Sequence, residues 1–270
     1  MGLAAHTVGI IGAGNMGRAI AAGLARASGM ARIRVFDTDR KKSEALLRDL
    51  AVEASTSIGD LAAVCDIIII AVKPDALASV LKELVGLPSG ALLVSIVAGA
   101  STESMEKALP PARKLVRAMP NTPALVGEGM TVLAPGTHAD AAAMALAGEL
   151  FSHIGKTLVL PERLMDAVTG LSGSGPAFVF TMIQAMADGG VKTGIPREQA
   201  LLLAAQTVLG AARMVLETGE DPAVLRARVA SPGGTTIEGL HALERAGFSG
   251  IVMDAVESAA LKSARLGGKK

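Results

Sequence analysis

The hydrophobic pattern of the N-terminal part of the chain alternates short apolar runs with amphipathic segments. One run, Ile67–Ile70, is unbroken and β-branched, which is typical of a strand covered on both faces, as in a parallel sheet. Alternating strands and helices predict an α/β fold with a Rossmann-like, doubly wound sheet. The expected strands span 7–11, 33–36, 52–54, 66–72, 91–97 and 114–118, followed by edge strands at 130–134 and 156–160.

The pattern changes after Pro161, where long apolar helices replace the alternation of strands and helices. Pro196 suits the first turn of a helix and Gly219 suits its end. We therefore expect a sheet domain over 1–161 and an all-α domain over 162–270. The expected helices span 177–191, 196–217, 236–246 and 251–266.

The helix expected at 196–217 is apolar on every face. It carries no charge between Glu198 and Arg213, so it must be buried all round. A domain of about 110 residues can hardly surround such a helix alone. A partner subunit is the simplest source of cover, which predicts a homo-oligomer whose dimerisation domain is the helical part.

A glycine motif follows the first strand and opens a helix, which is the context that a dinucleotide-binding G-x-G-x-x-G match needs. The first glycine turns the chain, the second leaves room for a pyrophosphate, and the third lets the helix pack closely on the strand. Free N–H groups at the start of that helix then face the phosphates. The alternative is a tight packing turn. The cofactor-binding candidates in this motif are Gly12, Ala13, Gly14, Asn15, Met16 and Gly17.

Small or polar residues also follow three other expected strands. Ligands of open α/β sheets bind beyond the carboxyl ends of the strands, so these tips predict the rest of the cofactor crevice. Each tip taken alone can instead be an ordinary turn. The candidates are Ala71, Val72, Lys73, Pro74, Ala98, Gly99 and Asn121.

Asp37 stands at the position of the acid that hydrogen-bonds an adenosine ribose, which favours NAD. Arg40, Lys41 and Lys42 follow closely and can instead hold the 2′-phosphate of NADP. The alternative is a helix N-cap at Asp37 or Thr38 with a solvated basic turn. The residues leave the choice between NADPH and NADH open.

Two hydroxyl-rich loops precede helices in the second half of the chain. In Ser231–Thr236, Gly233 and Gly234 expose backbone N–H groups, and Thr235 and Thr236 add hydroxyls, which predicts a carboxylate site. The alternative is an ordinary Ser/Thr cap. The other loop, 169–176, can hydrogen-bond a small polar substrate, and it is not a nucleophile elbow because no strand leads into it.

Composition narrows the function classes. Lys plus Arg total 26 and Asp plus Glu total 25, which argues against a nucleic-acid partner. The longest uncharged run has too short an apolar part to span a membrane, and no signal peptide is visible. Cys65 is the only cysteine and suits a reducing cytoplasm, where we expect it to be inert core. The scattered histidines predict no metal site.

Six stretches in the same order resemble the pyrroline-5-carboxylate reductase family, the last enzymes of proline biosynthesis. The pairing of the 171–177 and 231–236 stretches is specific to that family. The resemblance implies reduction of the C=N bond of 1-pyrroline-5-carboxylate by hydride from NADPH or NADH. It also implies dimers with interlocking helical domains, sometimes assembled into decamers. The matching stretches are Gly12–Gly17, 71–74, 119–125, 166–177, 185–191 and 231–237.

The resemblance also implies site residues. The substrate carboxylate falls to Gly234, Thr235 and Thr236, Thr169 lies beside the ring nitrogen, and Lys73 lies beside the nicotinamide. A protonated imine is already electrophilic, so either Thr169 relays a proton or the imine enters protonated. Two other interpretations stay open: a β-hydroxyacid dehydrogenase, for which Lys192 is the candidate catalytic lysine, and a non-catalytic dinucleotide sensor.

Overall fold

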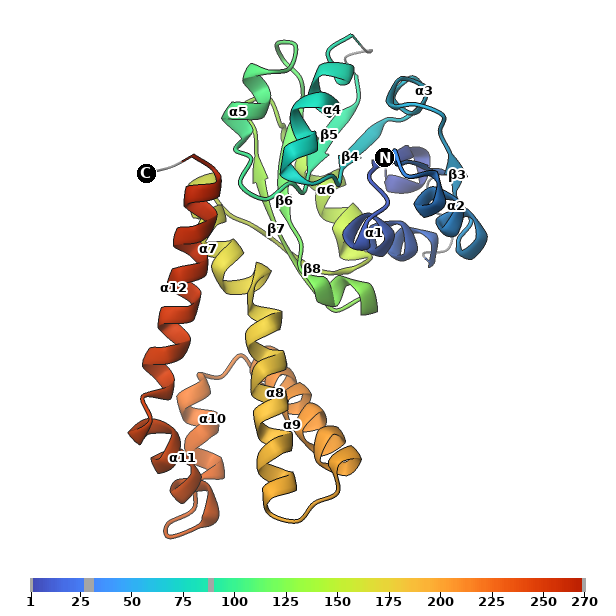
Figure 1. Ribbon diagram of the computed structural model, residues 1–270. Helices are drawn as coiled ribbons and strands as arrows, with labels where there is room; N and C mark the ends of the chain where they lie inside the picture. The colour runs from blue at the N-terminus through green and yellow to red at the C-terminus, as the bar shows by residue number, and fades with distance from the viewer. Residues whose placement is uncertain (1, 27–31, 87–89, 269–270) are drawn as a thin grey trace. The chain divides into compact units, whose positions relative to one another are not determined.

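A computed structural model describes residues 2–26, 32–86 and 90–268 of the chain (Figure 1). They form two compact units: the first contains the residues up to Ser174 and returns at Ser258, and the second spans Gly175–Glu257. The units thus divide later than Pro161. The reason is that Met165 and Val168 pack against Val132 and Ala134 of the sheet, which keeps the segment after Pro161 with the first unit. It stays a prediction that residues 1–161 bind the dinucleotide and that residues 162–270 bind the substrate.

The first unit is built on one eight-stranded sheet, in the order β3-β2-β1-β4-β5-β6-β7-β8. All neighbouring strands are parallel except β6 and β7. The order reverses beside β1, which is the doubly wound topology that the pattern predicts. β8 lies at the edge as expected, but β7 lies between β6 and β8 and is no edge strand. The strands are β1 Thr7–Ile11, β2 Arg32–Phe36, β3 Glu53–Ala54, β4 Ile67–Ile70, β5 Leu92–Ser95, β6 Leu115–Met119, β7 Gly129–Pro135 and β8 Gly155–Val159.

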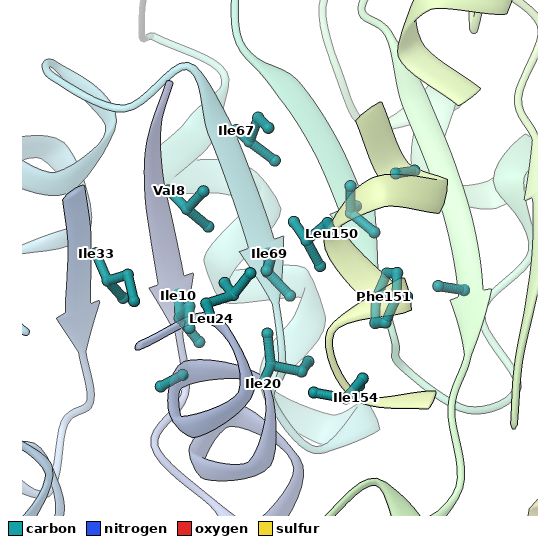
Figure 2. Packing of buried hydrophobic residues seen from close by; sticks show 14 of the residues in the cluster. Val8, Ile10, Ile20, Leu24, Ile33, Ile67, Ile69, Leu150, Phe151 and Ile154 are labelled. Carbon is teal, nitrogen blue, oxygen red and sulfur yellow. The ribbon is translucent and has the colours of Figure 1, made fainter. Parts of the chain in front are cut away.

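Helices cover both faces of this sheet. The isoleucines of β4 alternate between two cores: Ile67 and Ile69 pack with α1 and α6, whereas Ile68 and Ile70 pack with α3, α4 and α5. Figure 2 shows the first core, to which Ile69 of β4 and Leu150 and Phe151 of α6 belong. The helices of this unit are α1 Asn15–Arg26, α2 Arg40–Asp49, α3 Ile58–Ala62, α4 Leu77–Leu84, α5 Thr102–Lys107, α6 Ala141–Ser152 and α7 Met165–Val168.

Short turns of other helix types connect these elements. The π-helical segment after α7 is the first of the two hydroxyl-rich loops, and π-helical turns often occur at functional sites. The 3₁₀ segments are Leu3–Ala5, Pro74–Ala76, Thr122–Val126 and Glu162–Leu164, and the π-helical segment is Thr169–Gly173.

The second unit consists of helices joined by short loops, with no strand among its described residues. α8 and α9 pack side by side through Ala187, Ala200 and Ala204. Gly219 ends α9 in the left-handed conformation (φ 66°), as expected, whereas Pro196 is the N-cap and not part of the first turn. The helices are α8 Gly175–Lys192, α9 Arg197–Thr218, α10 Pro222–Val229 and α11 Thr235–Arg245; α12, Phe248–Leu266, begins in this unit and ends in the first.

α9 leaves most of its apolar surface uncovered in the single chain. Leu202 is 69% exposed and Leu209 is 45% exposed. By length and composition α9 is also the one described helix that can cross a membrane, a property it shares with helices buried in subunit interfaces. A helix of this kind requires cover that the single chain does not supply.

Candidate functional site

The glycine loop joins β1 to α1 in the geometry that the motif predicts. Gly12 has φ 107°, which favours glycine, and its N–H donates to the Phe36 carbonyl at 2.7 Å. A Cβ on Gly17 would collide with the carbonyl oxygen of Gly12, so the third glycine allows the close approach of helix and strand. Two of the three glycines are therefore required by the fold itself.

Gly14 is different, because nothing in the fold requires a glycine there. Its φ is not in the left-handed region, and a Cβ built on it would meet no atom within 4 Å. It is exposed and immediately precedes α1, whose first N–H groups have no intrahelical acceptor. The open space over Gly14 is where a pyrophosphate can approach the helix N-terminus, so the loop fits a dinucleotide.

A cleft of about 430 Å³ opens beside this loop, at the carboxyl ends of β1, β2 and β4. It has the size of a small-molecule site. Six of the cofactor-binding candidates line the cleft: two glycines of the motif, Asp37 and three residues that follow β4. Pro74 is the one candidate after β4 that does not line it. The candidates in the lining are Gly12, Gly14, Asp37, Ala71, Val72 and Lys73.

Further residues line the cleft beyond the cofactor-binding candidates named above. Thr38 and Lys42 line it, whereas Arg40 is exposed and does not. Asp75, Ser79 and Glu83 also line it. Their spacing of four residues places them on one face of the helical segment after β4, and that periodicity is the signal that could have found them.

Asp37 links the glycine loop to the end of β2. Its Oδ2 accepts a hydrogen bond from the Ala13 N–H at 2.7 Å, and its Oδ1 accepts one from the Asp39 N–H at 2.8 Å. The alternative of a helix cap at Asp37 or Thr38 is wrong, because Asp39 is the N-cap of α2 and accepts from the Lys41 N–H. Asp37 is thus a half-buried carboxylate held in the cleft wall.

The tip after β5 lies next to the tip of β4, since the two strands are parallel neighbours. Ala98 is exposed and Gly99 is half-buried with φ 76°. Neither lines the cleft beside the glycine loop. They extend the same edge of the sheet to the other side of β4, where the second half of a doubly wound sheet receives its ligand.

Asn121 follows the end of β6, where the sequence predicts a cofactor contact. Its side chain is buried, donates to the Ser172 carbonyl at 3.0 Å and accepts from the Met130 N–H at 2.8 Å. Its amide therefore connects the end of β6 to the π-helical segment and the start of β7. The side chain positions the loop that carries Thr169 and has both of its polar ends engaged within the protein.

Thr169 opens the π-helical segment and is half-buried. Its hydroxyl donates to the Met165 carbonyl at 2.8 Å. Because that proton is engaged, the oxygen offers lone pairs and acts as a hydrogen-bond acceptor toward a ligand. A hydroxyl engaged in this way is less suited to relay a proton than to accept a hydrogen bond from an imine that enters protonated.

In the second unit, the Ser231–Thr236 loop leads into α11. Gly233 has φ 68°, and Gly234 is the N-cap of α11 without any side-chain cap hydrogen bond. The alternative of an ordinary Ser/Thr cap is therefore wrong. The first N–H groups of α11, including those of Thr235 and Thr236, have no intrahelical acceptor, which is the arrangement of an anion site.

Cys65 is buried, and burial raises the pKa of its thiol to about 11. It packs against Gly9 and Leu61, as expected of an inert core residue. Within the ranges 2–26, 32–86 and 90–268, no group of three or more His, Cys, Asp or Glu side chains is placed to hold a metal ion.

The glycine loop, the cleft beside it and the doubly wound sheet define a dinucleotide-dependent oxidoreductase. Comparison with known proteins supports this class: the family model "NADP oxidoreductase coenzyme F420-dependent" matches residues 7–99, and "Pyrroline-5-carboxylate reductase dimerisation" matches residues 162–266. The chain is 46% identical to the pyrroline-5-carboxylate reductase of Methanosarcina acetivorans, covering 97% of this chain and 98% of that one. It belongs to the pyrroline-5-carboxylate reductase family.

Further relatives match this chain along almost its full length. The Escherichia coli pyrroline-5-carboxylate reductase is 44% identical, with 96% of this chain and 97% of that one covered. The Plasmodium falciparum pyrroline carboxylate reductase, solved with NADP bound, is 34% identical, with a TM-score of 0.89, and the match covers 98% of this chain and 100% of that one. Membership of this family excludes a β-hydroxyacid dehydrogenase, for which the exposed Lys192 was the candidate catalytic lysine.

The family match over residues 162–266 also explains the exposed surface of α9. This region is a dimerisation domain, so the chain forms a homo-oligomer. The expectation of a partner subunit, drawn from the apolar faces of the helix, is confirmed.

Proposed function

We propose that this protein reduces 1-pyrroline-5-carboxylate to L-proline with hydride from NADPH or NADH, the final step of proline biosynthesis, in the cytoplasm. The observation that carries the proposal is Gly14: it is a glycine that the fold does not need, at the place where a pyrophosphate meets the start of α1. Membership of the reductase family supplies the substrate.

The N–H groups at the start of α1 hold the pyrophosphate over Gly14. Asp37 lies where an adenosine ribose is bound in such folds, with Thr38 and Lys42 beside it. Lys73 and the Ala98–Gly99 tip flank the nicotinamide half of the crevice. When bound, the reduced nicotinamide supplies the hydride; the residues of the chain bind and orient both reactants.

The loop before α11 binds the substrate carboxylate. Thr235 and Thr236 offer backbone N–H groups and hydroxyl donors at an uncapped helix start, whereas the Gly234 N–H already donates to the Ser231 carbonyl at 3.1 Å. Holding a carboxylate orients the ring of the substrate. Orientation alone can lower a barrier by roughly 7–11 kcal/mol.

Thr169 acts on the ring nitrogen as an acceptor. Its hydroxyl proton is donated to Met165, so its oxygen can accept the N–H of a protonated imine. A protonated imine needs only a hydride at carbon to become the neutral amine, which then takes a proton from water. No acidic side chain is required, which fits a chain without tyrosine or tryptophan.

The oligomer is at least a homodimer in which the helical domains of two subunits interlock, and the resemblance leaves open whether dimers assemble further into decamers. The large exposed apolar surface of α9 supports an interlocked arrangement, since side-by-side contact would cover only one face of that helix.

The test is steady-state oxidation of NADPH and of NADH by the purified protein with 1-pyrroline-5-carboxylate, and with proline identified as the product. Turnover with either cofactor is expected. Tight cofactor binding without turnover would instead support a dinucleotide sensor, and turnover only with other imines would refute the substrate.

A further inference from the structure

The loop between β5 and α5 carries the nicotinamide-side candidates Ala98 and Gly99, and it is fixed at its start by the core. The Ser95 side chain is buried and its Oγ accepts from the Val97 N–H at 3.3 Å. Beyond Val97 the loop rises to the exposed edge of the sheet. Its outer part therefore depends on contacts from elsewhere in the chain.

One such contact comes from Glu162, just after β8. Its Oε1 accepts from the Thr102 N–H at 2.6 Å, and its Oε2 accepts from the Thr102 hydroxyl. Glu162 also pairs with Arg117 of β6, Oε1 to Nη1 at 3.3 Å, where the Arg117 side chain is only 3% exposed. A half-buried carboxylate thus clamps the end of the loop to the sheet.

The other contact comes from the end of α12. A Cβ on Gly267 would lie 2.8 Å from the carbonyl oxygen of Gly99, closer than side chains tolerate. The φ of Gly267 is not in the left-handed region, so only this close approach requires a glycine there. Its neighbour Gly268 is the opposite case, with φ 76° and open space around it.

The end of α12 is itself anchored to the first unit. Ser263 is buried, and its hydroxyl donates to Oδ1 of Asp166 at 2.9 Å. The Gly267 N–H donates to the Ser263 carbonyl at 3.0 Å, which continues the helical turn up to the contact with Gly99. Asp166, Ser263 and Gly267 form a short path from α7 to the loop.

We propose that Gly267 and Glu162 are positioning residues for the cofactor: the end of α12 and the Glu162 carboxylate together set the place of the Ala98–Gly99 backbone against the nicotinamide. This inference rests on the proposed function for the identity of the cofactor. It assigns a role to the C-terminal end of α12 that is separate from subunit assembly.

The proposal predicts a specific kinetic pattern for Gly267→Ala. The added methyl pushes the Gly99 carbonyl away, and misplacement of a reactant by about 1 Å can lower the rate by up to about a hundredfold. We expect kcat/KM for NADPH to fall about tenfold, with a raised Kd for NADPH measured by its fluorescence. The oligomeric state and the melting temperature should stay those of the wild type.

Gly148→Ala is the matched control, because Gly148 lies in α6 of the same unit and a Cβ there meets no atom within 4 Å. Its kinetics should stay within about twofold of the wild type. Equal values for Gly267→Ala and Gly148→Ala, in both kcat/KM and Kd, would overturn the proposal.

Thr102→Val tests the other contact without adding bulk, since it removes only the hydroxyl that donates to Glu162. A severalfold rise in KM for NADPH at unchanged stability supports the clamp, and an unchanged KM refutes it. If Gly267→Ala fails to fold, the result for Thr102→Val decides the proposal. If the wild type binds NADPH but does not turn over pyrroline carboxylate, the proposed function fails, while the Kd comparison still tests the positioning.

Discussion

The Asp37 carboxylate accepts a hydrogen bond from the Ala13 backbone N–H at 2.7 Å, across 24 residues of sequence. Its second oxygen accepts from the Asp39 N–H, so the side chain has one fixed orientation. Each carboxylate oxygen keeps a further lone pair with which it can accept from a ribose hydroxyl. A 2′-phosphate at the same place would meet a negative charge, although the Plasmodium relative binds NADP.

The first prediction concerns this choice of cofactor. Asp37→Ser should weaken the binding of NADH more than that of NADPH, because it removes both the acceptor for the ribose and a charge that repels the 2′-phosphate. Lys42→Ala should weaken NADPH selectively, and Arg40→Ala less, since only Lys42 lines the cleft. Steady-state KM values for both cofactors measure these effects. Equal effects on both cofactors for all three variants would mean that none of these residues discriminates.

A second prediction concerns Asn121. Asn121→Ala leaves the half-buried Met130 N–H and Ser172 carbonyl without their partner, and an unsatisfied group of this kind costs about 1–3 kcal/mol. We expect the free energy of unfolding to fall by about 2–4 kcal/mol and kcat to fall as the Thr169 segment loosens. Asn121→Asp keeps the acceptor for Met130 and should lose less stability. Urea unfolding and kcat measure the two effects, and an unchanged midpoint for Asn121→Ala would contradict the bridging role.

The strands could be predicted from the sequence because burial on both faces leaves a local signal. Ile67–Ile70 is apolar at every position, and the structure divides its side chains between two cores. The glycine motif was equally local, since strand, turn and helix are contiguous. α10 was missed because only Leu225 of its residues is buried, so it has no apolar stripe.

Tertiary partners left no such signal. The polar atoms of Asn121 meet Ser172, 51 residues away, and Glu162 meets Thr102, 60 residues away. The sequence shows that an amide side chain follows a strand, but it does not show whether that side chain hydrogen-bonds a ligand or another part of the protein. For the same reason Asp39, rather than Asp37 or Thr38, caps α2: all three are able to cap, and local backbone geometry decides.

A third prediction concerns assembly. Leu202→Asp or Leu209→Asp places a charge on an exposed apolar face of α9, which we propose that the partner subunit covers, and burying an unpaired charge is costly. We expect aggregated or unfolded protein, measured by size-exclusion chromatography with light scattering. Leu202→Met keeps the apolar volume and should assemble like the wild type. Well-folded, active monomers from either Asp variant would refute the interlocked arrangement.

A fourth prediction follows from Cys65, whose pKa is raised to about 11 by burial. Because the folded state keeps the thiol protonated when the unfolded state has lost its proton, stability is full below the ordinary thiol pKa of 9.0 and falls as pH rises toward about 11. The native thiol should also react slowly with disulfide reagents near neutral pH. Urea midpoints across this window, with Cys65→Ala as control, measure the effect; the same slope in both proteins would contradict it.

The last prediction concerns the substrate carboxylate. Thr236→Ala removes one donor to a charged group at the start of α11, a loss of roughly 1.5–3 kcal/mol. This corresponds to a fall in kcat/KM for pyrroline carboxylate of about tenfold to a hundredfold, with weaker inhibition by proline and nearly unchanged affinity for the dinucleotide. Thr236→Ser keeps the donor and should be much milder. If Thr236→Ala instead left proline inhibition intact and weakened the dinucleotide, this loop would belong to the nucleotide site, and the carboxylate would have to bind elsewhere.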